Sequence, residues 1–326
     1  MSVVSPLDAH APVSARSANT TPNRRYGTLT YSIVARDPAT GEIGVAVQSH
    51  YFSVGSVVPW AEAGAGGVAT QAFAEISYGP KGLDRMRDGA SAKAALRALV
   101  AADANAARRQ VAMVDARGGV AAHTGERCIP HAGHRIGDNV SVQANMMERD
   151  TVPDAMLAAY TATPGALPAR LLAALDAAEA EGGDIRGRQS AAMLVVSGTP
   201  SGNPWADRLL ELRVEDHPEP LTELRRLVDL HRAYRLLDEA ERAGAGGDAA
   251  AAAPKVIEAL QLAPGNAEIT AWAALGAASA GQLDVARQLL AQVTAHEPRW
   301  RELARRLRAL GDYNLPDETW AALLGD

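Results

Sequence analysis

The sequence has little cysteine, few aromatic side chains and no long apolar run, and each shortage excludes a class of protein. Cys128 is the only cysteine among 326 residues, so no disulfide can form within the chain. No stretch is long and apolar enough to span a bilayer. Because 47% of the residues are nevertheless hydrophobic, we expect a soluble globular protein, built as two domains rather than one.

The chain also lacks an excess of positive charge. It carries 32 Lys and Arg against 38 Asp and Glu, a formal net charge of −6. This balance disfavours nucleic acid and anionic membranes as partners. Residues 1–29 are rich in Ser, Ala, Pro and Asn, show no hydrophobic period and lack the apolar core of a signal peptide. We therefore expect a disordered leader and a cytoplasmic protein.

The strands and helices predicted from the sequence alternate in groups. Strands are expected at 30–36, 43–49, 54–60, 66–73, 110–115, 120–123, 140–145, 188–196 and 209–214. Helices are expected at 79–88, 91–102, 154–160 and 167–180. Hairpins that alternate with helix pairs argue against a parallel doubly wound sheet. They predict an α+β fold in which residues 30–216 form a four-layer α/β/β/α sandwich.

Residues 217–326 contain only helical patterns and are expected to form an all-α domain. A long amphipathic helix is predicted at 221–241, followed by a glycine-rich hinge at 243–247. The run Trp272-Ala273-Ala274-Leu275-Gly276 matches the opening of a tetratricopeptide unit, and Pro264 and Pro298 are 34 residues apart, which is the period of that repeat. An alanine-rich helical bundle is the alternative interpretation.

Two hydroxyl residues begin the first predicted strand. Thr30 and Ser32 are two positions apart, so both face the same side of the strand. A hydroxyl at the start of the first strand is the arrangement of an N-terminal-nucleophile hydrolase, where the α-amino group of the same residue acts as the base. A free amine at Thr30 would have a pKa of about 8, close enough to neutrality for that role. The alternative is that both hydroxyls only decorate an edge strand.

A second polar cluster runs directly into the buried strand at 188–196. It contains Asp184, Arg186, Arg188 and Gln189. Charged groups at such a position must be paired or must line a cavity, because an isolated buried charge is very unfavourable. Either arginine could bind a substrate carboxylate or an oxyanion, and Asp184 could orient an arginine or an amine. A salt-bridge network that locks the two sheets together is the alternative.

Two further strand ends carry candidate groups. The amides of Gln143 and Asn145 have same-face spacing and could donate to an oxyanion, or could satisfy the backbone of the following loop. Ser49 and His50 stand where the second strand ends, and His50 is a candidate base with a structural role as the alternative.

One spacing resembles half of a zinc site but does not predict one. Cys128, His131 and His134 have the pattern C-x2-H-x2-H. Pro130 and Gly133 indicate a loop there, and no second close His or Cys pair completes a structural site. We predict neither a metal ion nor a cofactor.

Several of these segments together resemble a known family. They are 30–35, 44–49, 53–59, 69–71, 77–82, 122–125, 143–146 and 184–190. On these motifs, residues 29–198 resemble the bacterial and archaeal family of unknown function DUF1028. The resemblance places the chain in the Ntn-hydrolase-like superfamily and implies the α/β/β/α sandwich. Some family members carry a C-terminal segment described as peptidoglycan-binding, and the segment from Asp216 to Pro220 resembles the start of one.

The leading hypothesis is an Ntn-type amidohydrolase that cleaves a small linear amide or peptide-like bond. Thr30 is the expected nucleophile and Ser32 the alternative, with the other candidate residues around the substrate. Family members usually begin at or next to the position of Thr30, so the leader is a departure, and a retained leader would leave Thr30 without a free amine. The competing hypothesis is a catalytically silent scaffold that binds protein or peptidoglycan through its C-terminal helices. In either case we expect a homo-oligomer.

Overall fold

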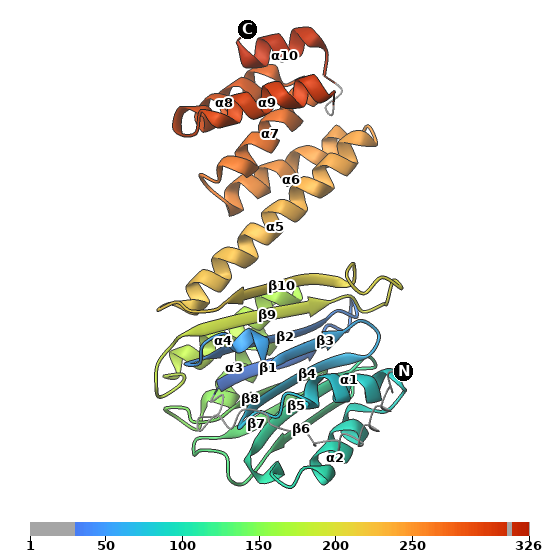
Figure 1. The fold of residues 1–326 in the computed structure, drawn as a ribbon, viewed down its shortest axis with the longest axis vertical. Helices are drawn as coiled ribbons and strands as arrows, with labels where there is room; N and C mark the ends of the chain where they lie inside the picture. The colour runs from blue at the N-terminus through green and yellow to red at the C-terminus, as the bar shows by residue number, and fades with distance from the viewer. Residues whose placement is uncertain (1–29, 312–314, 326) are drawn as a thin grey trace, which may run out of the picture.

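The computed structural model describes residues 30–311 and 315–325, and two antiparallel sheets build its N-terminal part (Figure 1). The strands are β1 (Thr30–Arg36), β2 (Ile43–Ser49), β3 (Pro59–Glu62), β4 (Gly66–Ala72), β5 (Arg109–Asp115), β6 (Val120–Thr124), β7 (Gly133–Gly137), β8 (Val140–Ala144), β9 (Ser190–Val196) and β10 (Arg208–Val214). The larger sheet has the order β10-β9-β2-β1-β8-β7, and the smaller sheet has the order β3-β4-β5-β6.

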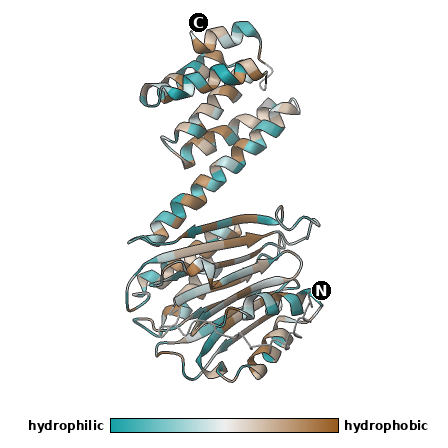
Figure 2. Cartoon of the chain, viewed as in Figure 1, coloured by the Kyte–Doolittle hydropathy of each residue, from teal (hydrophilic) through white to brown (hydrophobic). Residues whose placement is uncertain are grey.

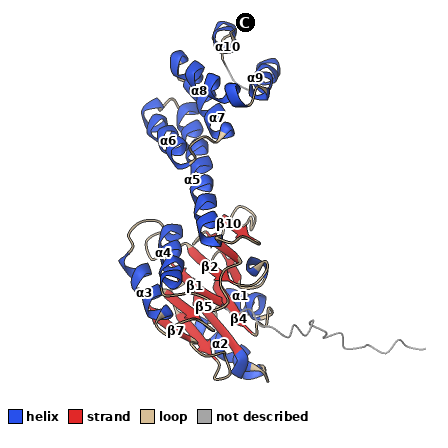
Figure 3. Cartoon of the chain, turned by 90° about the vertical axis from the view of Figure 1, so that its left-hand side faces the viewer, coloured by secondary structure: helices blue, strands red, loops and turns tan. Residues whose placement is uncertain are grey.

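Helix pairs cover the outer faces of both sheets (Figure 3). The helices α1 (Tyr78–Arg87) and α2 (Ala92–Ala102) pack on the smaller sheet, and α3 (Val152–Ala162) and α4 (Leu167–Ala180) pack on the larger one. The two sheets pack on each other through their inner faces. The predicted α+β fold and its four-layer order are confirmed.

The alternation of the strands divides the core into layers. On β1, Ile33 faces the helices and packs with Leu171 of α4, whereas Val34 faces the other sheet and packs with Val114 of β5. All of these side chains are fully buried. Apolar residues accordingly dominate the strands in Figure 2. Each such buried side chain contributes about 1.5–3 kcal/mol relative to an exposed one.

Two of the sequence predictions were wrong in detail. Residues 133–137 were not predicted as a strand, yet they form β7 at the edge of the larger sheet. The strand is half exposed and carries His134 and Arg135, so it lacks the apolar signal of a buried strand. The segment 54–60 was predicted to be a strand, but a short 3₁₀ turn at Val54–Ser56 precedes β3.

The predicted glycine-rich hinge at 243–247 is present only as a short turn. Helix α5 (Pro220–Ala245) continues through the first of those residues, and α6 (Ala249–Leu262) begins after a tight turn. The side chain of Asp248 accepts a hydrogen bond from the backbone N–H of Ala251 and so caps α6. The alanine run behind the glycines favours a helix strongly enough to make the connection short.

The remaining helices stand away from the sandwich. Helix α5 rises from the β10 edge and leads to α6, α7 (Ala267–Ser279), α8 (Leu283–His296), α9 (Arg299–Leu310) and α10 (Asp317–Leu324) (Figures 1 and 3). Pro264 and Pro298 lie in the turns before α7 and α9, and the rings of Trp272 and Trp300 meet edge to face at 6.2 Å. The tetratricopeptide interpretation stays a prediction. Within residues 30–311 and 315–325, no helix is long and apolar enough to cross a membrane.

Candidate functional site

The layer between the two sheets is apolar at one end and polar at the other. At the polar end six fully buried side chains meet, namely Thr30, Ser32, Gln71, Gln110, Gln143 and Asn145. They come from the start of β1, the end of β4, the start of β5 and the end of β8. Because antiparallel neighbours begin and end at the same edge, strand termini far apart in the sequence converge there. We call this set the inter-sheet polar cluster.

Thr30 is held mainly through its backbone. Its carbonyl oxygen accepts hydrogen bonds from the backbone N–H of Asn145 at 3.1 Å, from Asn145 Nδ2 at 3.4 Å and from Gln71 Nε2 at 3.1 Å. Its hydroxyl donates to Ser49 Oγ at 3.1 Å. Three donors on one carbonyl fix the first residue of β1 firmly in place.

Ser32 is held through its side chain. Its hydroxyl donates to Gln71 Oε1 at 2.6 Å and accepts from Gln143 Nε2 at 2.6 Å. The side-chain oxygen Oε1 of Gln143 accepts in turn from Ser141 Oγ at 3.0 Å. The proton of Ser32 is therefore directed at a neutral amide, which is not a base.

Gln71 and Gln110 complete the cluster, and the sequence analysis missed both. Gln110 Oε1 accepts from Gln71 Nε2 at 2.7 Å and from Asn145 Nδ2 at 2.8 Å. Each glutamine stands at one end of a strand whose middle is mostly apolar, which is the signal that could have identified it. Asn145 Oδ1 is buried and has no hydrogen-bond partner among the described residues. Asn145, which donates to the carbonyl oxygen of Thr30, therefore keeps a free hydrogen-bond acceptor among the described residues.

The loop at 182–189 brings Asp184 to the end of the sandwich at which β1 begins. The buried carboxylate of Asp184 accepts the backbone N–H of His50 at 3.2 Å, and its backbone pairs with Met147. These two residues follow β2 and β8, the strands that flank β1. Arg186 binds the same carboxylate through Nη2 at 2.7 Å and through Nε at 3.0 Å. An aspartate–arginine pair is thus placed beside the strand ends around Thr30.

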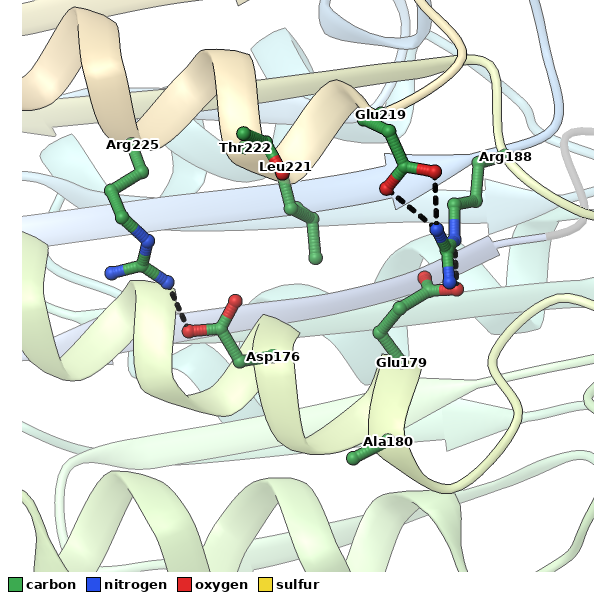
Figure 4. A pocket seen from close by; sticks show the side chains of 8 residues that line it. All are labelled: Asp176, Glu179, Ala180, Arg188, Glu219, Leu221, Thr222 and Arg225. Atoms are coloured by element: carbon green, nitrogen blue, oxygen red, sulfur yellow. Dashed lines mark hydrogen bonds and ion pairs between the residues drawn. The ribbon is translucent and has the colours of Figure 1, made fainter.

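Arg188 and Gln189 bind other carboxylates, although the backbone oxygen of Arg188 lies 3.2 Å from His50 Nδ1. Arg188 donates to Glu179 of α4 at 2.6 Å and to both carboxylate oxygens of Glu219 at 2.7 and 2.6 Å. Gln189 donates to Asp216 at 3.2 Å. Figure 4 shows Arg188 between the two glutamates, at a hollow of about 290 Å³ between α4 and the start of α5. Arg186 and Arg188, which the sequence analysis grouped, therefore bind different carboxylates.

Tyr31 connects that hollow to β1. Its hydroxyl donates to the carboxylate of Glu179, and it lies between Thr30 and Ser32 on the strand. Burial and the neighbouring Glu179 raise the pKa of Tyr31 well above its usual value, so the phenol stays protonated. Thr30 and Ser32 are fully buried, and neither lines this hollow. Among the described residues, this hollow therefore does not join Thr30 or Ser32 to Arg188.

The segment with the zinc-like spacing lies beside the inter-sheet polar cluster. Thr124 Oγ1 contacts both Gln110 Nε2 at 2.9 Å and His134 Nδ1 at 2.8 Å. Cys128 is buried and donates to the carbonyl of Arg109 at 3.4 Å. In the part of the chain that the structure describes, no three His, Cys, Asp or Glu side chains converge closely enough to hold a metal ion.

The fold and the site therefore define a class of protein. It is an antiparallel α/β/β/α sandwich with a buried polar cluster at the start of its first strand. The sequence profile of the family of unknown function DUF1028 matches residues 30–224, and the chain belongs to that family. A crystal structure of a DUF1028 protein from Silicibacter pomeroyi is similar, with 34% sequence identity and a TM-score of 0.55. That similarity covers 62% of this chain and 88% of the other. No curated protein sequence matches the chain.

Proposed function

We propose that the sandwich is an amidohydrolase of the N-terminal-nucleophile type, with Thr30 as nucleophile and a small linear amide or peptide-like bond as substrate. The observation that carries the proposal is the fixation of Thr30 at the start of β1, where three N–H donors bind its carbonyl oxygen. A nucleophile needs this kind of preorganised position.

The composition of the inter-sheet layer supports the proposal. At one end this layer is closed by side chains such as Val34, Val45 and Val114, so the fold can be stabilised there by apolar contacts alone. At the other end it buries amides and hydroxyls, which cost about 1–3 kcal/mol each wherever a hydrogen bond is missing. A cluster of this kind is less stabilising than an apolar one and is better explained by chemistry at Thr30.

The proposed reaction is an acyl transfer. The α-amine of Thr30 takes the proton of Oγ1, Oγ1 forms a bond to the amide carbon, and the leaving amine departs with that proton. Water then hydrolyses the ester on Thr30 and releases the acid. Asn145 or Gln143 would donate to the oxyanion, and Asn145 Oδ1 would accept from the ammonium. The buried Asp184 beside the start of β1 would stabilise that positive charge.

This mechanism requires that Thr30 be the first residue. In the full chain a peptide bond to Leu29 occupies the nitrogen that must act as the base. We therefore propose that the 326-residue chain is inactive and that removal of residues 1–29 frees the amine.

The test compares the full chain with a chain that begins at Thr30, after the masses of both have been measured. Both are treated with a β-lactone, which acylates activated hydroxyls, and with a panel of aminoacyl coumarin amides. We expect a covalent adduct on Thr30 and coumarin release only from the chain that begins at Thr30. Thr30→Ala should abolish both, and Thr161→Ala, on the exposed face of α3, should change neither. Equal labelling of both chains, or a folded Thr30-first chain that is inert to every probe, would refute the proposal.

Specific observations favour a second candidate, a catalytically silent scaffold. Thr30 and Ser32 are fully buried, and their hydroxyls are bound to neutral groups. The helices from α5 to α10 extend away from the sandwich and offer a surface for protein or peptidoglycan (Figure 1). Cosedimentation of the full chain with purified peptidoglycan tests the glycan branch. The scaffold would be favoured if the full chain sediments with peptidoglycan and the Thr30-first chain is inert in the activity test. Failure of the full chain to sediment would remove the glycan branch.

A further inference from the structure

A second hollow, of about 550 Å³, lies where β6 ends and β7 begins. Among its lining residues are Thr124, Glu126, Cys128, His131, His134 and Arg135. Arg135 is bound to the carboxylate of Asp154 at 2.6 and 2.8 Å, and Cys128 is buried. The two imidazoles are therefore the ring donors and acceptors that this hollow offers. We call it the imidazole hollow.

The contacts of His131 fix its tautomer. Its Nδ1 lies 3.1 Å from the carbonyl oxygen of Met147 and 2.9 Å from that of Glu148. Carbonyl oxygens only accept, so Nδ1 carries the hydrogen and the neutral ring keeps its lone pair on Nε2. His131 also has a φ of 54°, a left-handed conformation that is uncommon for residues other than glycine. Such strain is concentrated at functional sites.

The contacts of His134 favour the opposite tautomer. Thr124 Oγ1 has two contacts, Gln110 Nε2 at 2.9 Å and His134 Nδ1 at 2.8 Å. The amide nitrogen of Gln110 only donates, so of these two contacts only His134 Nδ1 can accept the hydrogen of the Thr124 hydroxyl. This contact favours the tautomer with the ring hydrogen on Nε2. Burial, together with the charges of Arg135 and His123, lowers the pKa of His134 and keeps the ring neutral.

One hollow therefore carries a ring acceptor, His131 Nε2, and a ring donor, His134 Nε2–H, and neither atom has a partner among the described residues. A secondary amide presents the complementary pair, an N–H and a C=O. We propose that the imidazole hollow is a binding site for a linear amide or peptide segment, with the amide N–H on His131 and the carbonyl on His134. The carboxylate of Glu126, which has no ion-pair partner in the described part of the chain, would accept a further N–H.

The position of the hollow relates it to the proposed active site. Thr124 contacts Gln110, and the side-chain oxygen of Gln110 binds Asn145, which holds Thr30. The choice of a linear amide as ligand rests in part on the proposed hydrolysis; the rest of this inference does not. Binding at the imidazole hollow requires neither the amine of Thr30 nor cleavage, so the two proposals can fail separately.

The first test is the tautomer of each ring, measured by long-range ¹H–¹⁵N correlation on the full chain at pH 7. We expect the Nδ1–H form for His131 and the Nε2–H form for His134. Thr124→Val removes the hydroxyl at nearly constant volume and should shift only His134 toward a tautomer mixture. Thr161→Val, on the surface of α3, is the matched control and should change neither ring. The same tautomer for both rings would overturn the proposal.

The second test uses N-acetylglycine N-methylamide as probe, on the full chain with its leader. We expect saturable shifts of the His131 and His134 resonances in the millimolar range. The analogue methylated on both amide nitrogens should bind several-fold more weakly, because it has no N–H to donate. His131→Phe should abolish the difference, whereas His296→Phe on α8 should leave it intact. Equal binding of both compounds, binding of acetate instead, or no shifts at all would refute the site. Binding without hydrolysis in any chain would leave this proposal standing and remove the other.

Discussion

Asn145 binds the carbonyl oxygen of Thr30 twice, through its backbone N–H at 3.1 Å and through its side-chain Nδ2 at 3.4 Å. The end of β8 thereby fixes the start of β1. The same side chain also donates to Gln110 on the other sheet at 2.8 Å. One residue therefore joins both sheets to the first residue of the candidate site, and its removal should affect stability as well as chemistry.

Asn145→Ala removes two side-chain hydrogen bonds within a fully buried cluster. The free energy of unfolding should fall by about 1–3 kcal/mol, because Thr30 and Gln110 each lose a donor. Urea denaturation monitored by circular dichroism measures this. Asn203→Ala, in the exposed loop before β10, is the control and should change stability by less than about 0.5 kcal/mol. Equal effects of the two substitutions would contradict the connecting role of Asn145.

Gly67 sets the distance between the two sheets at its position. A Cβ atom there would lie 2.9 Å from Ile43 Cγ2 and 3.0 Å from Val34 Cγ2, on the facing sheet. Gly67→Ala should therefore destabilise the sandwich by about 1–3 kcal/mol through overpacking. Gly276→Ala on α7 is the matched change, because a Cβ atom there would meet no atom within 4 Å. It should stabilise the protein by about 0.5–1 kcal/mol. Thermal unfolding of both variants measures the two changes in stability. The prediction is wrong if both changes have the same sign.

Arg188 links the sandwich to the base of α5 through Glu179 and Glu219. The guanidinium is partly exposed, so Arg188→Ala should cost only about 0–1 kcal/mol in global stability. Its local effect should be larger, with faster amide hydrogen exchange in the first turn of α5. Arg306→Ala breaks a pair with Glu302 inside α9 and should leave that turn unchanged. Unaltered exchange in the Arg188 variant would show that α5 is held by its apolar contacts alone.

Asp103 makes the smaller sheet and its helices sensitive to acid. Burial opposes its charge, but hydrogen bonds from Arg109 and from the backbone N–H of Asn105 outweigh this and lower the pKa of Asp103. A carboxyl whose folded-state pKa lies below its unfolded value stabilises the fold at higher pH, and that stability is lost as pH falls through the folded-state pKa. Asp103→Asn should therefore reduce the loss of stability between pH 5 and about 3. Asp238→Asn, exposed on α5, should leave the acid-dependent loss unchanged. A loss in Asp103→Asn as large as in the parent protein would contradict the assignment.

Much of the fold was predictable because it depends on local chemistry. The turn at Asp37–Gly41 and the β-branched runs on both sides of it predicted the hairpin of β1 and β2 with the observed bounds. The period of two placed Thr30 and Ser32 on one face, and both do face the other sheet. Edge strand β7 was missed because its half-exposed residues carry no apolar pattern.

The candidate site was predictable only in part, because it is assembled by long-range packing. Gln71 and Gln110 lie about 40 and 80 residues beyond Ser32, and only the pairing of sheets brings them together. Arg186 and Arg188 were grouped because they are two residues apart. Gly187 between them has a φ of 100°, so the chain turns and the two guanidinium groups bind different carboxylates.

The sequence by itself determined the order of the elements, the layers they form and the hydroxyl at the start of β1, since hydrophobic period, turn residues and helix caps act over a few residues. The tertiary structure alone decided the environment of that hydroxyl. It bound the carbonyl of Thr30 to amides that follow or end two other strands, placed Asp184 beside the start of β1 and brought His131 and His134 to one hollow. These properties depend on distances between strands and loops far apart in the chain, and such distances exist only once the two sheets have packed.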